Sequence, residues 1–442
     1  MRNNRKFWAA LIIFSLTGQI AWVVENMYFN VFIYKMFRAS ASDIALMVTA
    51  SSVAATVTTI LIGALSDRIG KRKIFMCAGY IAWGVSIISF ALIRADVISA
   101  VFGTAAGAAA VGITLVIIMD CVMTFFGSTA NDAAYNAWLT DSTDTGNRGA
   151  AEGINSMMPL ISILAVFGGF MGFDLDQASS WTAIYCIIGG LVLLIGILGF
   201  FLVEEAPMQQ PDSLGYLATI LYGFRPDVIR KNRTLYLSMT AFMLFNISIQ
   251  IYMPYLIIYY EQTLGMADYV LIMAPAIIMA AVVTFFFGRL VDRCGFRRTV
   301  LPSMLMLLAG FLLLWLIPAR IRLAGMAMKI PVFIGSLLMM AGYLSGMATY
   351  GTQLRNYTPE HMAGRFQGLR ILSQVLIPGL IGPQIGAWVL RDAPVITNSD
   401  GTTSFLPSAD IFLAALIVLL TVIAALSFGI LRTAGRSHTA RG

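Results

Sequence analysis

The chain has 442 residues, of which 59% are hydrophobic and only 12% are charged, and its net charge is +7. A soluble globular protein of this length needs far more charged surface, so the composition excludes that class and indicates a polytopic α-helical membrane protein. The positive charge fits membrane topology better than a nucleic-acid partner, which we do not expect.

Twelve apolar stretches of roughly 20 residues or more are predicted to be transmembrane helices. Six precede and six follow a polar connector at residues 204–233, so we expect one six-helix bundle over 1–203 and another over 234–442. Residues 98–111 are left open, because this Ala- and Gly-rich stretch suits an extension of the third or fourth helix or a re-entrant segment. The predicted helices span residues 7–34, 43–66, 74–94, 112–139, 153–173, 181–203, 234–260, 269–291, 300–318, 330–354, 367–390 and 410–432.

The connector contains three prolines and a Tyr216-Leu-x-x-Ile220-Leu-Tyr222 stretch. This pattern predicts a short amphipathic helix on the inner membrane face, with an unstructured tether as the alternative.

Lys and Arg residues are distributed unequally among the segments that join the predicted helices. With both termini inside, the inner segments carry 22 of them and the outer segments carry 7. Because positive residues are enriched on the cytoplasmic side, we expect both termini in the cytoplasm and a multi-pass protein of the plasma or inner membrane.

One basic loop signature occurs twice, 225 positions apart, with the spacing Gly-x3-Asp-Arg-x-Gly-x-Arg. A loop duplicated half a chain apart is typical of a transporter built from two homologous halves. We expect both copies to act as gating elements. Their residues are Gly63, Asp67, Arg68, Gly70 and Arg72, and Gly288, Asp292, Arg293, Gly295 and Arg297.

A second pair of similar loops, residues 143–153 and 358–368, follows the fourth and the tenth predicted helices. Thr, Gly and Gly keep the same intervals in both. We expect Gly63 and Gly288 of the first pair to allow close helix packing near the inner surface.

An ionic latch between the two pairs of loops is the role predicted for their charges. Asp67 and Asp292 are expected to pair with Arg148 and Arg365, closing the inner mouth in one state and opening it in the other. The alternative is that these charges only fix the topology.

Three acidic residues lie well inside predicted helices, and all are in the N-terminal half: Glu25, Asp120 and Asp132. A charge at the bilayer centre costs about 2.5–3.5 kcal/mol, so such residues normally face a polar cavity or a partner. A carboxyl group in a low-dielectric cavity can bind and release a proton near neutral pH, which makes all three candidates for cation coupling. For Asp120, a purely structural role as a hydrogen-bond acceptor is the alternative.

Asp132 has the most polar surroundings, because Asp132, Tyr135 and Asn136 are spaced to share one helical face. Carboxylate and amide groups suit vicinal hydroxyls, and aromatic rings stack on the apolar face of a sugar. The first helix adds a stripe of Trp22 and Asn26, continued by Asn30 and adjacent to Glu25, and we expect these residues to contact the solute.

The C-terminal half contributes no buried acid but offers neutral hydrogen-bonding groups and aromatic rings. Asn246 and Gln250 share a face of the seventh helix, and Tyr350 and Gln374 lie in the tenth and eleventh. We expect these four at the solute site. A stripe of tyrosines suits a pocket or a packing role equally: Tyr252, Tyr255 and Tyr259. The unequal halves suit a neutral polyhydroxylated solute.

Chemistry other than transport finds little support in the sequence. The four cysteines form no CxxC pair, there are only two histidines, and no GxxxxGK[ST] loop occurs. We therefore expect free cysteines, no metal site, no cofactor, no catalytic residues and no ATP-driven pumping.

Twelve predicted helices with the doubled loop resemble the major facilitator superfamily over essentially the whole chain. Within it, Asn131-Asp132 through Asp141-x-Thr143 and Arg148 resembles the glycoside-pentoside-hexuronide:cation symporters and the sucrose-transporter-like group. In the melibiose-permease branch an Asp of the fourth helix contacts the sugar. The resemblance implies that Asp132, which matches that position, is a sugar ligand and that the loops are gates.

One departure from that family concerns the coupled ion. Sodium-coupled members carry Asp residues in the second helix, whereas residues 44–66 contain no acid and Ala55 and Thr59 stand at those positions. The departure favours a proton on Glu25 or Asp132 over Na+.

The sequence thus predicts a monomeric secondary transporter in the lipid bilayer. Its expected activity is cation-coupled symport of a sugar or glycoside by alternating access. An exporter of amphipathic small molecules and a lipid or lysolipid transporter are the alternatives.

Overall fold

A computed structural model of the chain describes residues 5–102, 105–143, 147–205, 222–320, 326–358, 369–398 and 401–425. Within these ranges the chain is helical apart from one two-stranded hairpin, β1 (Val395–Thr397) and β2 (Thr403–Phe405). The chain divides into two compact units. Unit 1 is Met1–Gly215 with Thr397–Ser404, and unit 2 is Tyr216–Ile396 with Phe405–Gly442.

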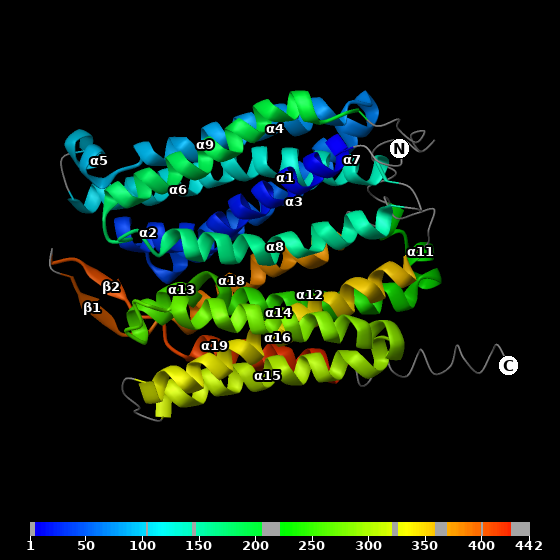
Figure 1. The fold of residues 1–442 in the computed structure, drawn as a ribbon. Coiled ribbons are helices and arrows are strands. Elements are labelled where there is room, and N and C mark those ends of the chain that lie inside the picture. The colour runs from blue at the N-terminus through cyan, green and yellow to red at the C-terminus, as the bar shows by residue number, and fades with distance from the viewer. Residues whose placement is uncertain are drawn as a thin grey trace. The chain divides into compact units, whose positions relative to one another are not determined.

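Unit 1 contains the first six membrane helices (Figure 1). The helix α4 packs along α9, α1 along α8, and α3 along α6. The elements are α1 (Arg5–Val23), η1 (Val24–Tyr28), α2 (Phe29–Phe37), α3 (Ala41–Ile69), α4 (Arg72–Ser89), η2 (Phe90–Leu92), α5 (Ala95–Phe102), α6 (Ala105–Gly127), η3 (Ser128–Tyr135), α7 (Asn136–Asp141), α8 (Arg148–Phe170) and α9 (Ala178–Leu202).

The ends of α3 show how the sequence sets helix boundaries. At its start, the Ser40 hydroxyl accepts a hydrogen bond from the Asp43 amide, while the Asp43 carboxylate accepts one from the Ser40 amide. At its end, Gly70 adopts a left-handed conformation and its amide bonds to the Ser66 carbonyl. Between them, the helix exposes a stripe of apolar side chains suited to lipid: Leu46, Val53, Val57, Leu61 and Leu65.

Unit 2 contains the remaining membrane helices, of which α15 and α16 pack closely side by side. Pro254, which lacks an amide hydrogen, sits in a short 3₁₀ turn that interrupts the seventh helix. The elements are η4 (Tyr222–Phe224), α11 (Pro226–Lys231), α12 (Arg233–Tyr252), η5 (Met253–Tyr255), α13 (Leu256–Ile258), η6 (Tyr259–Thr263), α14 (Val270–Cys294), α15 (Phe296–Arg320), α16 (Met326–Tyr357), η8 (Leu372–Leu376), α18 (Ile377–Val389) and, beyond the hairpin, α19 (Asp410–Ala425).

The predicted all-helical fold is confirmed. Among the described residues, 11 helical stretches are long and apolar enough to cross a membrane, and a shorter apolar helix covers Asp410–Ala424, where the twelfth was predicted. The open stretch 98–111 joins neither neighbour simply: α5 is a separate short helix and α6 already begins at Ala105. The predicted amphipathic stretch in the connector, 216–222, lies outside the described residues except for Tyr222, and the described end of the connector consists of η4 and α11.

The two copies of the duplicated signature share one backbone feature but differ in conformation, since Gly70 is left-handed with a ψ of 21° and Gly295 has a ψ of 172°. Gly70 and Gly295 both have positive φ, of 74° and 73°, and each follows the last turn of a long helix. A side chain there is strained, which explains the second glycine of the signature. The expectation of close packing at Gly63 and Gly288 is wrong, since a Cβ at either position would meet no described atom within 4 Å.

Candidate functional site

Four π-helical turns interrupt the described helices: η1, η3, η6 and η8. Such turns are rare and occur frequently at functional sites. Three of them contain residues predicted to bind solute or cation, with Glu25 in η1, Asp132 in η3 and Gln374 in η8. The irregular backbone therefore coincides with the candidate site.

The carboxylate of Asp132 is held in place from both sides, and the residue as a whole is half-buried. The Ser128 hydroxyl donates to its Oδ2 at 3.0 Å, and Asn131 Nδ2 lies 3.4 Å from its Oδ1. Asn136, which is exposed, donates from Nδ2 to the Asp132 backbone carbonyl. A carboxylate fixed beside an amide suits the predicted role of Asp132 as a solute ligand.

Asn131 is in turn positioned by residues that the sequence reasoning did not single out. The Tyr80 hydroxyl lies 2.8 Å from the Phe14 carbonyl and 3.0 Å from Asn131 Oδ1. Gly18 leaves the space for this contact, because a Cβ there would stand 2.4 Å from Asn131 Oδ1 and 2.6 Å from Tyr80 Oη. The site on η3 is thus supported by α1 and α4.

Tyr135 does not share the accessible face of Asp132 and Asn136, contrary to the prediction from helical spacing. It is buried, and its hydroxyl lies 3.0 Å from Asn155 Oδ1 on α8 and 3.4 Å from the Leu11 carbonyl. The wider π-helical turn changes the rotation per residue, so spacing rules for an α-helix fail here. Tyr135 is a packing residue of unit 1 in this structure.

The stripe on the first helix is only partly accessible. Asn26 is exposed and Trp22 is half-buried, but Asn30 is fully buried, so the predicted stripe does not present three side chains to solute. The Trp22 and Trp83 rings lie 5.0 Å apart at 48°, against Gly127. Both indole Nε1 atoms are buried without a described hydrogen-bond partner.

Glu25 and Asp120 form a second, deeper group, with 7% and 2% of their surface exposed. Thr124 donates to Glu25 Oε1 at 2.7 Å, and the Ser51 hydroxyl of α3 lies beside Asp120. Glu25 Oε2 and Asp120 Oδ1 have no hydrogen-bond partner among the described residues, and the two carboxyl groups interact electrostatically.

A regular spacing of polar residues in the sequence also marks this site, and the prediction did not use it. Asp120, Thr124, Ser128 and Asp132 are spaced four apart, so they follow one side of the fourth membrane helix. Two of these residues are hydrogen-bond donors to the acids of the site. Within the described part of the chain, no group of three or more His, Cys, Asp or Glu is arranged to hold a metal ion.

The predicted residues of unit 2 are less accessible than those of unit 1. Asn246 is buried and donates to the Phe242 carbonyl of its own helix, whereas Gln250 and Gln374 are half-buried. Tyr350 is fully buried against the rings of Phe242, Phe245 and Phe296, so its predicted contact with solute does not hold in this structure.

The tyrosine stripe of the seventh helix is a packing stripe here. Tyr252, Tyr255 and Tyr259 are all fully buried, and Tyr252 and Tyr259 lie against the ring of Phe412. The same span extends to Thr263 and therefore includes Glu261, which is half-buried. The prediction that the C-terminal half has no acid within a membrane helix is therefore wrong.

The loop charges form a contact that differs from the predicted latch. Arg72 Nε lies 3.1 Å from Asp141 Oδ2, with both side chains largely buried, and Arg72 Nη1 donates to the Ser66 hydroxyl. The predicted partners cannot be compared, because the side chains of Asp67 and Arg148 and the whole of Arg365 lie outside the described residues. The remaining charged side chains of the two signatures are exposed: Arg68, Asp292, Arg293 and Arg297.

The sequence of residues 7–383 matches the family model of the Major Facilitator Superfamily. The chain belongs to the Major Facilitator Superfamily. It is therefore a multi-pass membrane transporter of this superfamily, and not an enzyme. No curated protein matches the sequence.

Solved structures of Major Facilitator Superfamily transporters share the fold of this chain. The nucleoside transporter NupG, in the form of a point mutant, has a TM-score of 0.70 at 12% identity, covering 96% of this chain and 100% of NupG. The xylose transporter XylE from E. coli in a partially occluded inward-open conformation has a TM-score of 0.66 at 13% identity, covering 95% and 97%. An occupied, inward-facing bacterial homolog of the human lysosomal transporter Spinster has a TM-score of 0.66 at 15% identity, covering 96% of each chain. At these identities the likeness concerns the fold alone.

Proposed function

We propose that this superfamily member is a proton-coupled symporter of a sugar or glycoside that works by alternating access in the plasma or inner membrane. The observation that carries the proposal is the division of the three acids of unit 1 into one half-buried residue and two buried ones. Asp132 is half-buried and held by hydrogen bonds, whereas Glu25 and Asp120 are buried, with one oxygen each unpartnered among the described residues. We assign solute recognition to the first and proton binding to the other two.

The chemistry around Asp132 suits a hydroxylated solute. A carboxylate accepts hydrogen bonds from two adjacent hydroxyls, and the amides of Asn26 and Asn136 both donate and accept. The half-buried Trp22 ring supplies an apolar surface. This donor and acceptor set fits the resemblance to glycoside symporters, which implies that Asp132 is a sugar ligand.

Glu25 interacts with both Asp120 and Asp132, and this links proton binding to solute binding in the proposed mechanism. Its charge interacts with that of Asp120 and, more weakly, with that of Asp132. A proton on the buried pair removes a repelling charge from the neighbourhood of Asp132 and changes the energy of solute binding there. Sodium remains the alternative ion, although α3 contributes no acid to the group.

The orientation that supports this cycle places both termini in the cytoplasm, since most Lys and Arg residues are then on the inner side. The Arg72–Asp141 pair then lies at the cytoplasmic end of unit 1 and belongs to the proposed inner gate. We further propose that the monomer is the functional form.

Uptake into proteoliposomes tests the proposal. Labelled melibiose, sucrose, xylose and uridine are offered separately, with and without an inwardly directed pH gradient, because the ribose of a nucleoside also carries adjacent hydroxyls. We expect accumulation of at least one of the three sugars, stimulated by the gradient. Accumulation of uridine alone would contradict the sugar assignment, and uptake indifferent to the gradient would contradict proton coupling.

Two variants separate the assigned roles. Asp132→Asn should weaken binding of the accepted solute by about 10- to 100-fold, since a charged hydrogen bond contributes about 1.5–3 kcal/mol. Glu25→Gln should leave solute exchange at equal pH intact while abolishing stimulation by the gradient. If Asp132→Asn transports normally, an exporter of amphipathic compounds or a lipid transporter becomes the better assignment.

A further inference from the structure

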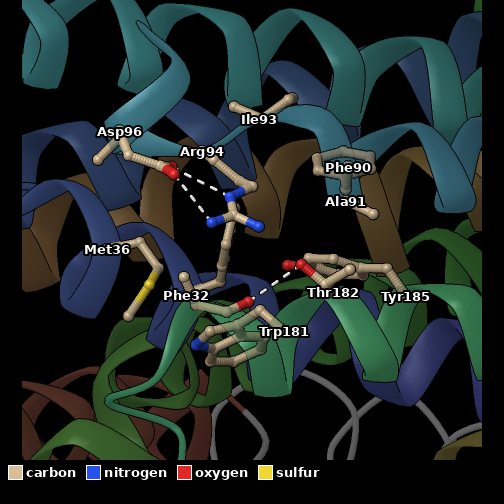
Figure 2. A pocket seen from close by; sticks show the side chains of 12 residues that line it. Phe32, Met36, Phe90, Ala91, Ile93, Arg94, Asp96, Trp181, Thr182 and Tyr185 are labelled. Atoms are coloured by element: carbon tan, nitrogen blue, oxygen red, sulfur yellow. Dashed lines mark hydrogen bonds and ion pairs between the residues drawn. The ribbon is translucent and has the colours of Figure 1, made fainter. Parts of the chain in front are cut away.

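A pocket of about 180 Å³ opens at the end of unit 1 opposite the Gly63–Arg72 loop (Figure 2). It lies between α2, the η2 region and α9. Arg94 and Asp96 stand at this pocket and pair with each other through two hydrogen bonds. The volume has room for about six water molecules, at roughly 30 Å³ each.

Tyr185 on α9 is one of the residues that line this pocket. Its ring packs against Phe29, Phe32 and Phe90 with centroid distances of 5.2–5.5 Å. Its hydroxyl is buried and has no hydrogen-bond partner among the described residues, although it interacts electrostatically with Asp120. A phenylalanine would serve the ring packing equally well without burying an unpaired hydroxyl, so the packing does not explain the tyrosine.

The ionisable groups of unit 1 form a sequence of increasing depth from this pocket. The end of α2 at Phe37 packs on Gly112 of α6, which gives a common reference level. At 1.5 Å per helical residue, Asp120 lies about 12 Å below that level, Glu25 about 18 Å and Asp132 about 30 Å. Tyr185, whose ring contacts Phe29 and Phe32, stands at about 8–12 Å.

The groups of this sequence are close enough for their charges to interact. Tyr185 interacts with Asp120, Asp120 with Glu25, and Glu25 with Asp132. Asp120 Oδ1 and Glu25 Oε2 are buried and lack a partner among the described residues, as does the Tyr185 hydroxyl. Three buried polar atoms without a described partner, on residues that descend from a pocket lined by Tyr185, suit a proton path.

We propose that Tyr185 relays protons between the outer pocket and the Asp120–Glu25 pair, so that this pocket is the entrance through which the coupling carboxyl groups are loaded. The inference rests on the proton coupling and the orientation proposed above. It adds a route and a residue, Tyr185, that solute binding does not require.

The transfer conserves protons at each step. A hydronium ion in the pocket passes a proton through water to the Tyr185 oxygen, since the hydroxyl itself is buried, and the original O–H bond of the tyrosine breaks. The released proton passes through one bridging water, because the hydroxyl and Asp120 Oδ1 are not in hydrogen-bond contact. An O–H bond then forms on Asp120 Oδ1, and the pocket is left with a neutral water. The same steps in reverse unload the pair.

Time-resolved infrared spectroscopy on proteoliposomes tests the relay without knowledge of the solute. The medium outside the vesicles is acidified rapidly in an impermeant buffer, and the absorbance of protonated carboxyl groups is followed. The variants Asp120→Asn and Glu25→Gln identify the signal of the pair. Tyr185→Phe removes only the hydroxyl, and Ser238→Ala, which deletes a buried hydroxyl in unit 2 that also lacks a described partner, is the matched control.

We expect Tyr185→Phe to slow the appearance of the carboxyl signal by about tenfold or more, the factor that corresponds to one lost hydrogen bond of ~1.4 kcal/mol, while the final amplitude stays unchanged. Ser238→Ala should match the wild type. A wild-type rate in Tyr185→Phe overturns the relay but leaves proton coupling intact. No pair signal in the wild-type protein overturns the proposed coupling itself and the relay with it. An unchanged final amplitude also shows that the variant is folded.

Discussion

The two units repeat the same loop sequence but not the same chemistry. Unit 1 buries carboxyl groups within its membrane helices and supports Asp132 with hydrogen bonds from Ser128 and Asn131. Unit 2 instead buries aromatic rings within its membrane helices, including those of Tyr252, Tyr259 and Tyr350. The difference shows that the repeated scaffold determines the fold, whereas a small number of polar substitutions on one copy determine what it can bind.

The inner loops show the same divergence in a single pair of positions. Arg72 of unit 1 is buried and paired with Asp141. The equivalent positions in unit 2, at the offsets of the two duplications, are Arg297 and Asn356, and both are exposed. Unit 1 therefore has an acid at the position where unit 2 has an amide. Arg72 and Arg297 can be compared directly for this reason.

The largest effect that we expect comes from breaking this pair. Arg72→Gln leaves the Asp141 carboxylate largely buried without its partner and should lower the free energy of unfolding by about 3–5 kcal/mol. Arg297→Gln, at the exposed equivalent, should change it by less than about 1 kcal/mol, because exposed charge interactions contribute little. Thermal unfolding of the purified proteins in detergent measures both. The double variant Arg72→Gln with Asp141→Asn should recover part of the lost stability. Equal effects of the two arginine variants would contradict the proposed difference between the units.

A smaller effect is expected where unit 1 makes room for its polar network. Gly18→Ala forces a methyl group against Asn131 Oδ1 and Tyr80 Oη, so it should destabilise the protein by about 1–3 kcal/mol. Gly190→Ala, in the interior of α9 with no atom within 4 Å of the new Cβ, should stabilise it by up to about 1 kcal/mol. The same unfolding experiment compares them. Opposite signs of the two stability changes would support tight packing around Asn131. If Gly18→Ala leaves the stability unchanged, the close approach at Gly18 is not needed.

The smallest effect concerns an exposed pair in unit 2. Lys329 donates to Asp268, and this hydrogen bond lowers the pKa of the Asp268 carboxyl. Because the folded pKa lies below the unfolded value of about 3.9, the stabilisation is present above that pH and is lost as the pH falls through the folded pKa. Asp268→Asn should therefore cost about 0.2–1 kcal/mol at neutral pH. The difference from wild type should be constant above about pH 5 and shrink below about pH 4, and a difference that grows on acidification would contradict the assignment.

The features that the sequence predicted correctly are those with a local cause. Membrane spans follow from the length of apolar stretches. Glu25 and Asp120 were singled out because an acid among apolar residues is costly wherever it lies, and both are buried.

The features that were missed depend on contacts between distant residues or on irregular backbone. Tyr80 and Gly18 support Asn131 only because three helices meet there, and no local pattern marks them. The π-helical turn η3 displaces Tyr135 from the face that α-helical spacing predicts. Thr124 and Ser128, by contrast, follow the four-residue spacing of the acids and were available to the sequence reasoning.

Cysteine accessibility tests most directly whether Asp132 and Glu25 have different environments. In a background in which the four native cysteines are replaced, Asp132→Cys and Glu25→Cys are exposed to a small hydrophilic thiol reagent in vesicles. We predict rapid labelling of Asp132→Cys, slowed by any sugar that the protein accumulates, and little labelling of Glu25→Cys. Equal labelling of the two variants, or labelling of Glu25→Cys alone, would contradict the division of unit 1 into an accessible solute ligand and a buried coupling pair.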